Sequence, residues 1–339
     1  MRTRGVLIGL SAVLAVLGLP AIAQVKANAY LSFQYEAGGS QSAFPDGSFR
    51  GTQAGLLITG QPGNLFFYNL EIRLKTETQA AIEEAWVAVE PWAAFGLKLG
   101  LYLVPFGKYN RSSRPHETAF IRPPLHLEAM VPPSWRDIGL LVEGRAGIFR
   151  YAAYLGNGLG EAADLSSSQQ YEDNNAEKAA GGRAGVLLSQ SFEVGFSYYR
   201  GKYDDGNSRA LALQGADVTW QNDAFLFLYE YGKALVENPE GYARGETEGH
   251  FFFLSLRAGE FSPWASYQKV NVADPFHGPG FSSGASPGSG IFSRLSRWAL
   301  GLTYAPAPGL LIKVEYDFNR ESDISLDNDV VLAQVALRF

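Results

Sequence analysis

The 339-residue chain contains no cysteine, which excludes a disulfide framework, a thiolate metal site and a cysteine nucleophile. Histidine is scarce, and its four copies are dispersed without the spacing of a metal site. Charged residues make up only 18% of the chain, the formal net charge is -6, and no basic tail predicts nucleic-acid binding. The sequence therefore indicates no cofactor, no metal and no nucleic-acid partner.

Long apolar runs are absent after residue 23. Before that point, Arg2 and Arg4 precede an apolar run from Val6 to Leu19, and Ala21-Ile22-Ala23 has the pattern of a cleavage site. We predict that residues 1–23 are a secretory signal peptide and that residues 24–339 form one domain. An uncleaved membrane anchor is the alternative, although the run is short of the ~20 residues that a spanning helix needs.

What the chain has in place of long apolar runs is alternation of apolar and polar residues with a period of two. One side of a predicted strand carries Phe66, Tyr68, Leu70, Ile72 and Leu74, and the other carries Asn69, Glu71, Arg73 and Lys75. A soluble β-sandwich would also alternate, but its strands are typically about five or six residues long. These runs are about nine to twelve residues, the length of a tilted strand that crosses a bilayer.

Aromatic residues also collect near the predicted strand ends, as in the interfacial girdles of membrane barrels. We therefore predict an all-β fold, a transmembrane antiparallel β-barrel in the bacterial outer membrane. About sixteen strands can be placed, at residues 28–37, 52–60, 65–75, 81–90, 95–104, 136–144, 146–156, 182–190, 192–202, 209–220, 222–233, 247–258, 261–272, 293–305, 309–319 and 329–339.

The lengths of the predicted connections follow a rule. Every long connection comes after an odd-numbered strand, and the connections after even-numbered strands are short turns. This is the pattern of a barrel with its termini and short turns in the periplasm and its longer loops outside. The last strand ends in Phe339, which resembles the terminal aromatic signal that the barrel assembly machinery recognises; an ordinary edge strand is the alternative.

A barrel of about sixteen strands encloses an aqueous channel, so the polar side of its strands becomes the candidate pore wall. The candidate lining cations are Arg73, Lys75, Lys98, Arg145, Arg150, Arg183, Arg257, Arg297 and Lys313. The acids among them are Glu71, Glu84, Glu143, Glu193, Glu230, Glu315 and Asp317. Because the signs are mixed, the simpler interpretation is that these residues hydrate the wall and pair with each other.

The third external loop, residues 105–135, concentrates positive charge and proline. Its cations, with the first residue after it, are Lys108, Arg111, Arg114, Arg122 and Arg136, against only Glu117 and Glu128. Six of the 17 prolines lie here, which stiffens the loop. We predict that it folds toward the lumen and forms a constriction that favours anions. The alternative is a loop outside the barrel, with its cations on lipopolysaccharide phosphates.

The central region resembles the phosphate-selective porin O and P family. The resemblance rests on Glu84-Ala85-Trp86-Val87, Leu97-Lys98-Leu99-Gly100, Val104-Pro105-Phe106-Gly107, Arg136-Asp137-Ile138-Gly139 and Asn157-Gly158. It implies an outer-membrane porin of roughly sixteen strands, often a homotrimer, that passes small anions. The cations here are fewer than in the specialised members and are interleaved with acids, so phosphate selectivity does not carry over.

We therefore predict a porin for passive diffusion of small hydrophilic solutes, with a weak preference for anions such as phosphate. Its expected partners are these solutes, outer-membrane lipid and lipopolysaccharide. The alternative function is a barrel enzyme, a hydrolase, or an adhesin without an open pore. A hydrolase would need His116 or His126 to pair with Ser112, Ser113 or Ser134, but no nucleophile motif supports this, and we assign no catalytic residue.

Overall fold

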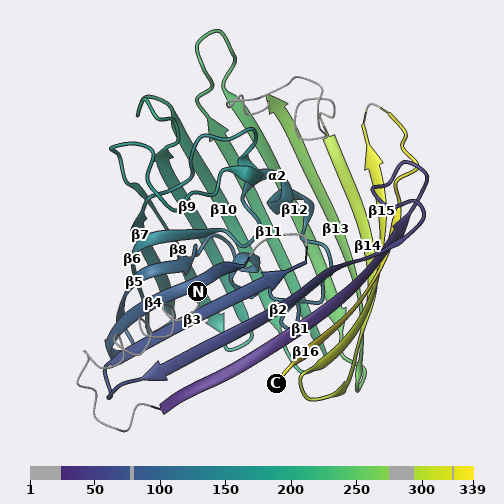
Figure 1. Cartoon of the computed structure of the whole chain (residues 1–339), viewed down its shortest axis with the longest axis horizontal. Helices are drawn as coiled ribbons and strands as arrows, with labels where there is room; N and C mark the ends of the chain where they lie inside the picture. The colour runs from purple at the N-terminus through teal and green to yellow at the C-terminus, as the bar shows by residue number, and fades with distance from the viewer. Residues whose placement is uncertain (1–23, 77–79, 275–293, 323) are drawn as a thin grey trace, which may run out of the picture.

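The computed structural model describes residues 24–76, 80–274, 294–322 and 324–339, and within them sixteen strands form one closed antiparallel barrel. Each strand pairs with its neighbours in sequence, and β1 pairs with β16 to close the ring (Figure 1). The strands are β1 (Gln24–Gly38), β2 (Ser48–Gln61), β3 (Phe66–Lys75), β4 (Ala81–Trp92), β5 (Phe95–Leu103), β6 (Arg136–Ala146), β7 (Phe149–Gly156), β8 (Ala179–Ser189), β9 (Phe192–Lys202), β10 (Ala210–Gln221), β11 (Phe225–Val236), β12 (Gly245–Leu256), β13 (Phe261–Asp274), β14 (Arg294–Ala307), β15 (Leu310–Glu321) and β16 (Val330–Arg338).

The predicted barrel of about sixteen strands is confirmed, with boundaries that move by a few residues. β2 begins at Ser48 and not at residue 52, because its pairing with β1 continues past a bulge, with Tyr35 opposite Phe49. The predicted signal peptide, residues 1–23, lies outside the described residues. Within the described part of the chain, no helix is long and apolar enough to span a membrane.

Alternation decides which side chains face outward. On β15, Ile312, Val314 and Tyr316 are exposed on the outside, whereas Lys313, Glu315 and Asp317 point inward and are at most 1% exposed. Successive side chains of a strand point to opposite faces, so the antiparallel register carries this division from strand to strand. The outer surface is consequently apolar, as a lipid-facing surface must be.

The two ends of the barrel differ. The long connections lie at one end, here called the loop end, and the short turns lie at the other, the turn end, together with the carboxyl terminus (Figure 1). The closure seam extends to the last residue, since the Phe339 N–H donates to the Ala29 carbonyl (2.9 Å) and the Ala29 N–H donates back (2.7 Å). This pairing leaves no open sheet edge at the seam, which a membrane barrel requires.

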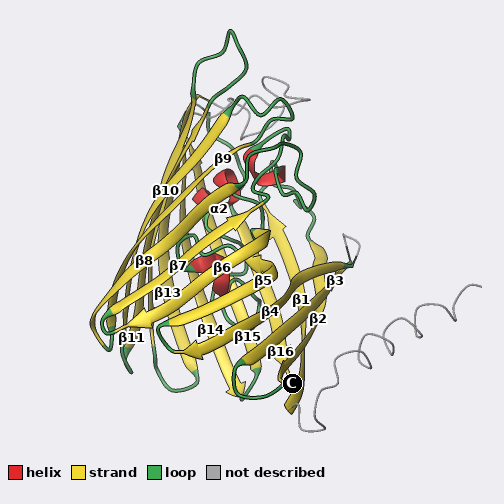
Figure 2. Ribbon diagram, turned by 90° about the vertical axis from the view of Figure 1, so that its left-hand side faces the viewer, coloured by secondary structure: helices red, strands yellow, loops and turns green. Residues whose placement is uncertain are grey.

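The loop between β5 and β6, residues 105–135, lies inside the barrel and is called the inner loop. It contains a 3₁₀ turn, η1 (Tyr109–Ser112), and a short helix, α2 (Leu125–Met130), which contacts β11, β12 and β13 on their inner side (Figure 2). A second 3₁₀ turn, η2 (Leu165–Ser167) in the β7–β8 connection, packs against α2. The predicted folding of the third long loop toward the lumen agrees with this arrangement.

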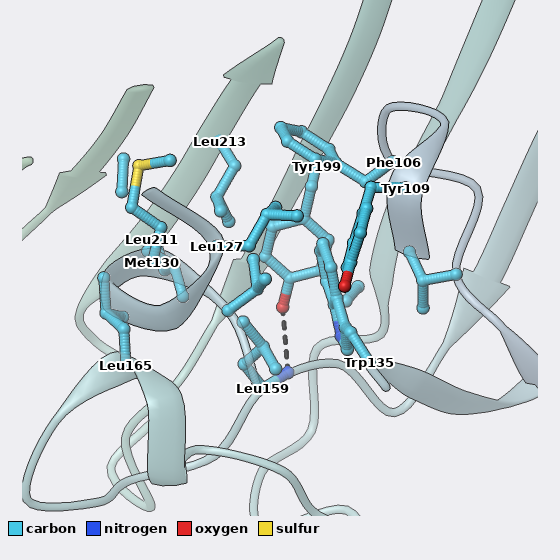
Figure 3. Close-up of a cluster of buried hydrophobic side chains, with 14 of the residues drawn as sticks. Phe106, Tyr109, Leu127, Met130, Trp135, Leu159, Leu165, Tyr199, Leu211 and Leu213 are labelled. Carbon is cyan, nitrogen blue, oxygen red and sulfur yellow. Dashed lines mark hydrogen bonds between the residues drawn. The ribbon is translucent and has the colours of Figure 1, made fainter. Parts of the chain in front are cut away.

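An apolar core holds the inner loop against one side of the wall. Phe106, Leu127, Met130 and Trp135 of the loop pack with wall residues that include Leu211 and Leu213 of β10 and Tyr199 of β9 (Figure 3). Phe251 and Phe253 of β12 and Trp264 of β13 belong to the same cluster. The inner face of these strands is therefore apolar where the loop covers it.

Candidate pore and its constriction

The inner loop begins at a sharp corner, Pro105-Phe106-Gly107. Gly107 has φ +62, and its N–H donates to Ser197 Oγ on β9 (3.0 Å). The next two N–H groups, of Lys108 and Tyr109, both donate to Glu230 Oε2 on β11, at 2.9 and 3.1 Å. A Cβ at position 107 would lie 2.2 Å from Glu230 Oε1, so the corner requires glycine for both its φ and its space.

Asn110 joins the two ends of the inner loop. Its Nδ2 donates to the carbonyls of Val104 (2.9 Å) and Trp135 (2.8 Å), and its Oδ1 accepts from the Trp135 N–H (2.9 Å). The side chain is buried, so these bonds satisfy backbone groups that water does not reach. Asn110 therefore holds the two ends of the inner loop, at Val104 and Trp135, at a fixed separation.

A row of three glycines forms the floor under the loop. Gly215, Gly232 and Gly249 lie opposite one another on β10, β11 and β12, with their α-carbons facing the lumen. Phe106, Met130 and His126 rest on them in that order, at 3.0, 2.5 and 2.7 Å from where a Cβ would stand. The absence of side chains lets the loop approach the sheet this closely.

The loop then crosses the lumen to the opposite wall. The Ile121 N–H donates to Glu315 Oε2 (2.6 Å), and Lys313 Nζ donates to the carbonyls of Pro115 (2.6 Å) and Thr118 (3.0 Å). Arg297 Nη1 donates to the Pro123 carbonyl (3.3 Å). Buried wall residues of β14 and β15 thus hold the far part of the loop, and two predicted lining cations, Arg297 and Lys313, are buried under it.

Each of the five predicted constriction cations forms an ion pair. The shortest N–O distances are 2.8 Å for Lys108–Glu193, 2.8 Å for Arg111–Glu143, 2.6 Å for Arg114–Glu71, 2.8 Å for Arg122–Glu36 and 3.2 Å for Arg136–Glu83. The partners come from β9, β6, β3, β1 and β4, so the pairs connect the loop and its exit to the wall on several sides. Their net charge is consequently much smaller than the loop sequence alone indicates.

Arg114 is the most heavily paired of these cations. Its guanidinium contacts Glu71, Glu84 and Glu117. Burial lowers the pKa of Arg114, but the hydrogen bond and charge of Glu71 outweigh burial and raise it above its usual range. Burial raises the pKa of Glu117, but the hydrogen bond with His116 and the charge of Arg114 outweigh it, so this pKa is lowered.

Three cavities of comparable size adjoin the inner loop. The first, of about 500 Å³, lies at the loop end and is lined by the β1–β2, β7–β8 and β15–β16 connections and by α2. The second, of about 510 Å³, lies between the loop and β1 to β3. The third, of about 500 Å³, lies under η1 toward the turn end, where Ala93 and Arg145 line it.

The turn η1 stands between the second and third cavities. Tyr109, Asn110 and Ser113 line the second, whereas Lys108, Arg111 and Ser112 line the third. Tyr109 is buried, and this burial raises its pKa well above the usual range, so its hydroxyl is uncharged at neutral pH. Residues of η1 and its immediate neighbours therefore border both cavities.

The cavities differ in the charges that line them. The second cavity has the cations Arg50, Arg73, Lys75 and Arg122 against Glu36 and Glu128. The third has Lys108, Arg111, Arg145, Arg150 and Arg183 against Glu143 alone. The first has Arg122 and Arg297 against Glu128, Asp164 and Glu321. Positive charge therefore increases from the loop end toward the turn end.

The acids that balance these cations are mostly buried behind them. Glu71, Glu230 and Glu315 are at most 1% exposed, and Glu193 is 5% exposed. Arg183 contacts Glu193 and Asp217, and Lys98 contacts Glu143 (2.5 Å) and lies over the Trp86 ring. The second and third cavities are consequently lined by more cations than acids, while Glu71, Glu193, Glu230 and Glu315 are buried in the protein.

The remaining predicted lining residues fall in three places. Arg145 and Arg150 are exposed in the third cavity, and Glu84 contacts Arg114 and Asn69. Arg257 follows the end of β12 and is exposed in the turn to β13, because the strand ends at Leu256. Arg257 is therefore at the rim of the turn end and not on the strand wall.

The histidines of the inner loop do not form a catalytic pair among the described residues. His126 is fully buried and lies 3.6 Å from Glu230, and His116 packs on Tyr30. The hydroxyls of Ser112 and Ser113 donate to loop carbonyls. Ser134 Oγ accepts from Arg73 (3.2 Å), and no histidine contacts a serine hydroxyl within the described part of the chain. The described residues also hold no cluster of His, Asp and Glu that could bind a metal ion.

Several residues that build the site were not singled out from the sequence. Glu36, Glu83 and Asn110 have no local motif, although Glu36 follows an alternating strand pattern. The same is true of Gln268 on β13, whose Oε1 accepts from the Leu125 N–H at the start of α2 (3.0 Å). Glu230 and Glu315 were candidates for the wall, but their bonds to the loop backbone depend on how strands pair around the barrel. The glycine row has a signal in the sequence, one glycine within each of three successive strands, which becomes visible once the register is known.

Comparison with solved structures finds the same architecture in porins. The chain is similar to OmpF of Salmonella typhi in complex with daunomycin (13% identity, TM-score 0.67, 93% of this chain and 97% of that chain). It is similar to the anion-selective porin from Comamonas acidovorans (10% identity, TM-score 0.64, 93% and 99%). It is also similar to the trimer form of OmpT of Vibrio cholerae (12% identity, TM-score 0.64, 94% and 99%). At these identities the likeness shows the fold, which is the sixteen-stranded porin fold.

Among curated proteins, the chain is similar to an uncharacterized protein of Aquifex aeolicus (strain VF5), with 22% identity over 291 residues. The match covers 77% of this chain and 66% of that relative. No family model matches the chain, so the resemblance to the phosphate-selective porins stays a prediction. A closed antiparallel barrel with an apolar outer surface is the architecture of bacterial outer-membrane proteins, and it places the chain in that membrane.

Proposed function

We propose that the protein is an outer-membrane porin through which small hydrophilic solutes diffuse passively. The observation that carries this proposal is the inner loop inside a closed barrel, with a cavity on each side of η1. A barrel of this strand number leaves a lumen wider than side chains fill, and the inner loop narrows it. With the long connections outside and the short turns in the periplasm, the third cavity is the periplasmic vestibule.

The constriction in this proposal is η1 and its ion pairs. Lys108 and Arg111 project from η1 and the residue before it toward the periplasmic vestibule. Arg114 and Arg122 hold the loop to β3 and β1, and Arg136 holds its exit to β4. All five cations are paired with carboxylates, but these last three act mainly as anchors, because their side chains are less exposed (10%, 23% and 10%) than those of Lys108 and Arg111 (30% and 36%).

A weak preference for anions follows from the way charges face the cavities. Cations line the second and third cavities, while most of the balancing carboxylates are buried against the protein. An anion near η1 is attracted by the nearer cations and partly repelled by the acids behind them, which keeps the preference modest. Phosphate, suggested by the family resemblance, is one such anion, and arginine geometry suits it.

We also propose that the protein forms a homotrimer. The outer face of β1 to β4 and β16 is apolar and includes the small residues Ala29 and Ala54, which permit close approach of a second copy. OmpT of Vibrio cholerae, which has the same fold, is described in a trimer form. Export through the signal peptide and recognition of Phe339 by the barrel assembly machinery belong to the same proposal.

Planar-bilayer recording of the purified full chain tests the porin function. We expect stepwise ohmic conductance, and in a KCl gradient a reversal potential with the sign of chloride permeation. A barrel enzyme or an adhesin without an open pore would give no steps. A reversal potential at zero or with the sign of potassium permeation would refute the anion preference and leave the porin function intact.

Paired variants locate the source of the preference. Arg145→Gln with Arg150→Gln removes two exposed cations of the periplasmic vestibule, and we expect the reversal potential to move toward that of potassium. Arg257→Gln is the matched control, because it removes an exposed cation at the same end of the barrel but outside this cavity. Equal shifts for the double variant and the control would show that the vestibule does not set selectivity.

A further inference from the structure

Four odd-numbered strands carry the same pair of outward residues near the loop end. The pairs are Tyr198 with Arg200 on β9, Tyr231 with Lys233 on β11, Tyr267 with Lys269 on β13, and Phe318 with Arg320 on β15. In each pair the aromatic residue precedes the cation by two positions, so both side chains lie on the same face of the strand. Because odd-numbered strands run toward the loop end, each cation is nearer that end than its aromatic partner.

Strand register shows that this face is the outer one. Tyr198 and Phe196 share the face of Arg200 and are 47% and 66% exposed. Lys269 lies opposite His250 on β12, and Asn271, two residues further on, lies opposite Arg294 on β14. Arg294 adds a fifth cation to the row, four residues before the outward Trp298. The cations and aromatics of β9, β11, β13, β14 and β15 therefore lie at one level of the outer face, here called the cationic band. Between them β10 presents Ala212 and Gln214, and β12 presents Glu246 and Glu248.

Part of the cationic band is already paired within the protein. Lys233 pairs with Glu246 (2.5 Å), and Arg320 pairs with Asp329 (2.9 Å). Glu248, the other outward acid of β12, accepts from Tyr231 (3.0 Å). Arg200, Lys269 and Arg294 form no ion pair within residues 24–76, 80–274, 294–322 and 324–339. Three cations thus face outward without a protein partner in that part of the chain.

The other half of the barrel lacks this pattern. At the corresponding positions, β1 has Tyr35 and Ala37, β3 has Ile72 and Leu74, β5 has Leu101 and Leu103, and β7 has Ala153 and Leu155. No strand among these four places an outward cation there within the described residues. Among the odd-numbered strands, the aromatic–cation pair is therefore confined to β9, β11, β13 and β15, and β1, β3, β5 and β7 are apolar at these outward positions.

Unpaired cations on the outside of a membrane barrel need an anionic partner at the lipid surface. A cation that faces hydrocarbon is costly, whereas one at the interface extends its charged end toward the headgroups. Aromatic residues mark the interface level, and here each lies just below its cation. The order of apolar wall, aromatic ring and cation matches a leaflet in which phosphates lie directly above the acyl chains.

We propose that the cationic band is a docking surface for phosphorylated lipid headgroups of the outer leaflet, the lipid A phosphates of lipopolysaccharide. Arg200, Lys269 and Arg294 bind the phosphates, and the aromatic residues beneath them pack against the upper acyl chains. The opposite, apolar half of the barrel takes no part in this binding. The inference is independent of ion selectivity, since a barrel with a closed lumen would present the same band.

Binding of lipopolysaccharide to the purified full chain in detergent tests the proposal. Native mass spectrometry or native electrophoresis would follow titration with lipopolysaccharide and with the same lipid after removal of its lipid A phosphates. We expect the phosphorylated form to bind and the dephosphorylated form to bind at least tenfold more weakly. Neutralising one interfacial cation weakens such binding by about fivefold, so the triple variant Arg200→Gln, Lys269→Gln, Arg294→Gln should lose about a hundredfold.

Arg257→Gln, at the turn end, is the matched control and should bind like the wild type. Heat-dependent gel mobility checks that each variant is folded, and Arg294→Gln alone, expected to be about fivefold weaker, serves if the triple variant does not fold. Equal binding of the two lipid forms, unchanged binding by the folded variants, or an equal loss in Arg257→Gln would overturn the proposal. A smaller oligomer for the triple variant in lipid-free detergent would also overturn it, because the band would then contact a second copy.

Discussion

Glu230 is the wall residue on which the position of η1 depends most directly. Its Oε2 accepts hydrogen bonds from two consecutive backbone N–H groups, Lys108 (2.9 Å) and Tyr109 (3.1 Å), and the side chain is 1% exposed. Replacing it by alanine leaves both donors without a partner in a buried place. Replacing it by glutamine keeps an acceptor of the same shape and removes the charge.

The size of the effect follows from the two bonds. A hydrogen bond to a charged group contributes about 1.5 to 3 kcal/mol, so Glu230→Ala should destabilise the closed position of η1 by about 3 to 6 kcal/mol. Since about 1.4 kcal/mol is a factor of ten, local opening becomes about a hundred to ten thousand times more frequent. Charge-assisted bonds are roughly twice as strong as neutral ones, so Glu230→Gln should lose about half of that free energy.

Amide hydrogen exchange measures this opening at the two donors themselves. With mass spectrometry on a peptide that covers residues 106–112, we expect exchange to quicken in the order wild type, Glu230→Gln, Glu230→Ala, while exchange of β6 is unchanged. Glu90→Gln is the matched control, because this exposed carboxylate of β4 accepts no hydrogen bond within the described residues. Exchange in Glu230→Ala within about threefold of the wild type would refute the reasoning, since the predicted minimum is about a hundredfold.

Three further changes test other parts of the loop. Gly232→Val places a branched side chain where Met130 Cε lies 2.5 Å from the Cβ position, and we expect a loss of about 1 to 3 kcal/mol and a larger, noisier conductance. An unchanged conductance would mean that α2 does not rest on β11. Asn110→Ala removes three hydrogen bonds and should lower the free energy of unfolding by about 1.5 to 4.5 kcal/mol in denaturant titration. A change below about 0.5 kcal/mol would show that these bonds do not hold the two ends of the inner loop together. The pKa of Glu117 is lowered in the folded state, so its contribution is present above the usual carboxyl pKa of about 4.3 and is lost as the pH falls through the lower folded value. The melting temperatures of the wild type and Glu117→Gln should therefore converge as the pH falls from about 5 to about 3. A difference in melting temperature that stays constant over this range would exclude a contribution from the ionisation of Glu117.

The barrel could be predicted because its signals are local. The alternation from Ile312 to Phe318 indicates which residues share a face, and the lengths of the connections indicate at which end of the barrel each turn lies. Both signals depend only on residues that are close together in the sequence. The concentration of charge and proline in residues 105–135 likewise indicated a loop with a structural role, and the loop lies in the lumen.

The pairing of the loop cations could not be predicted, because it depends on distance around the barrel and not along the chain. Arg114 meets Glu71, which is 43 residues away, and Ile121 meets Glu315, which is 194 residues away. The loop sequence shows five cations and two acids, whereas the wall supplies the missing acids from five strands. The electrostatic character of the pore thus depends on the register of the strands around the barrel, which cannot be read from local residue patterns.

The apolar inner surface has a similar explanation. A polar lumen was the natural expectation for a porin, yet Phe251, Phe253 and Trp264 point inward. Around these residues the strands are apolar on both faces, a pattern that is typical of a sheet covered on both sides. Here lipid covers one face and the inner loop covers the other, so the rule applies once the loop is known to lie there.

The bonds between the inner loop and β15 have a consequence for the order of folding. Lys313 and Glu315 reach the loop across 198 and 194 residues of sequence, and the seam between β1 and β16 joins the two ends of the described barrel. Contacts of such high sequence separation form late, because a long chain segment must first be enclosed. The constriction of the lumen is therefore complete only after the last hairpin, β15–β16, has paired. A chain that ended before Lys313 would lack the residues that fix the position of the inner loop.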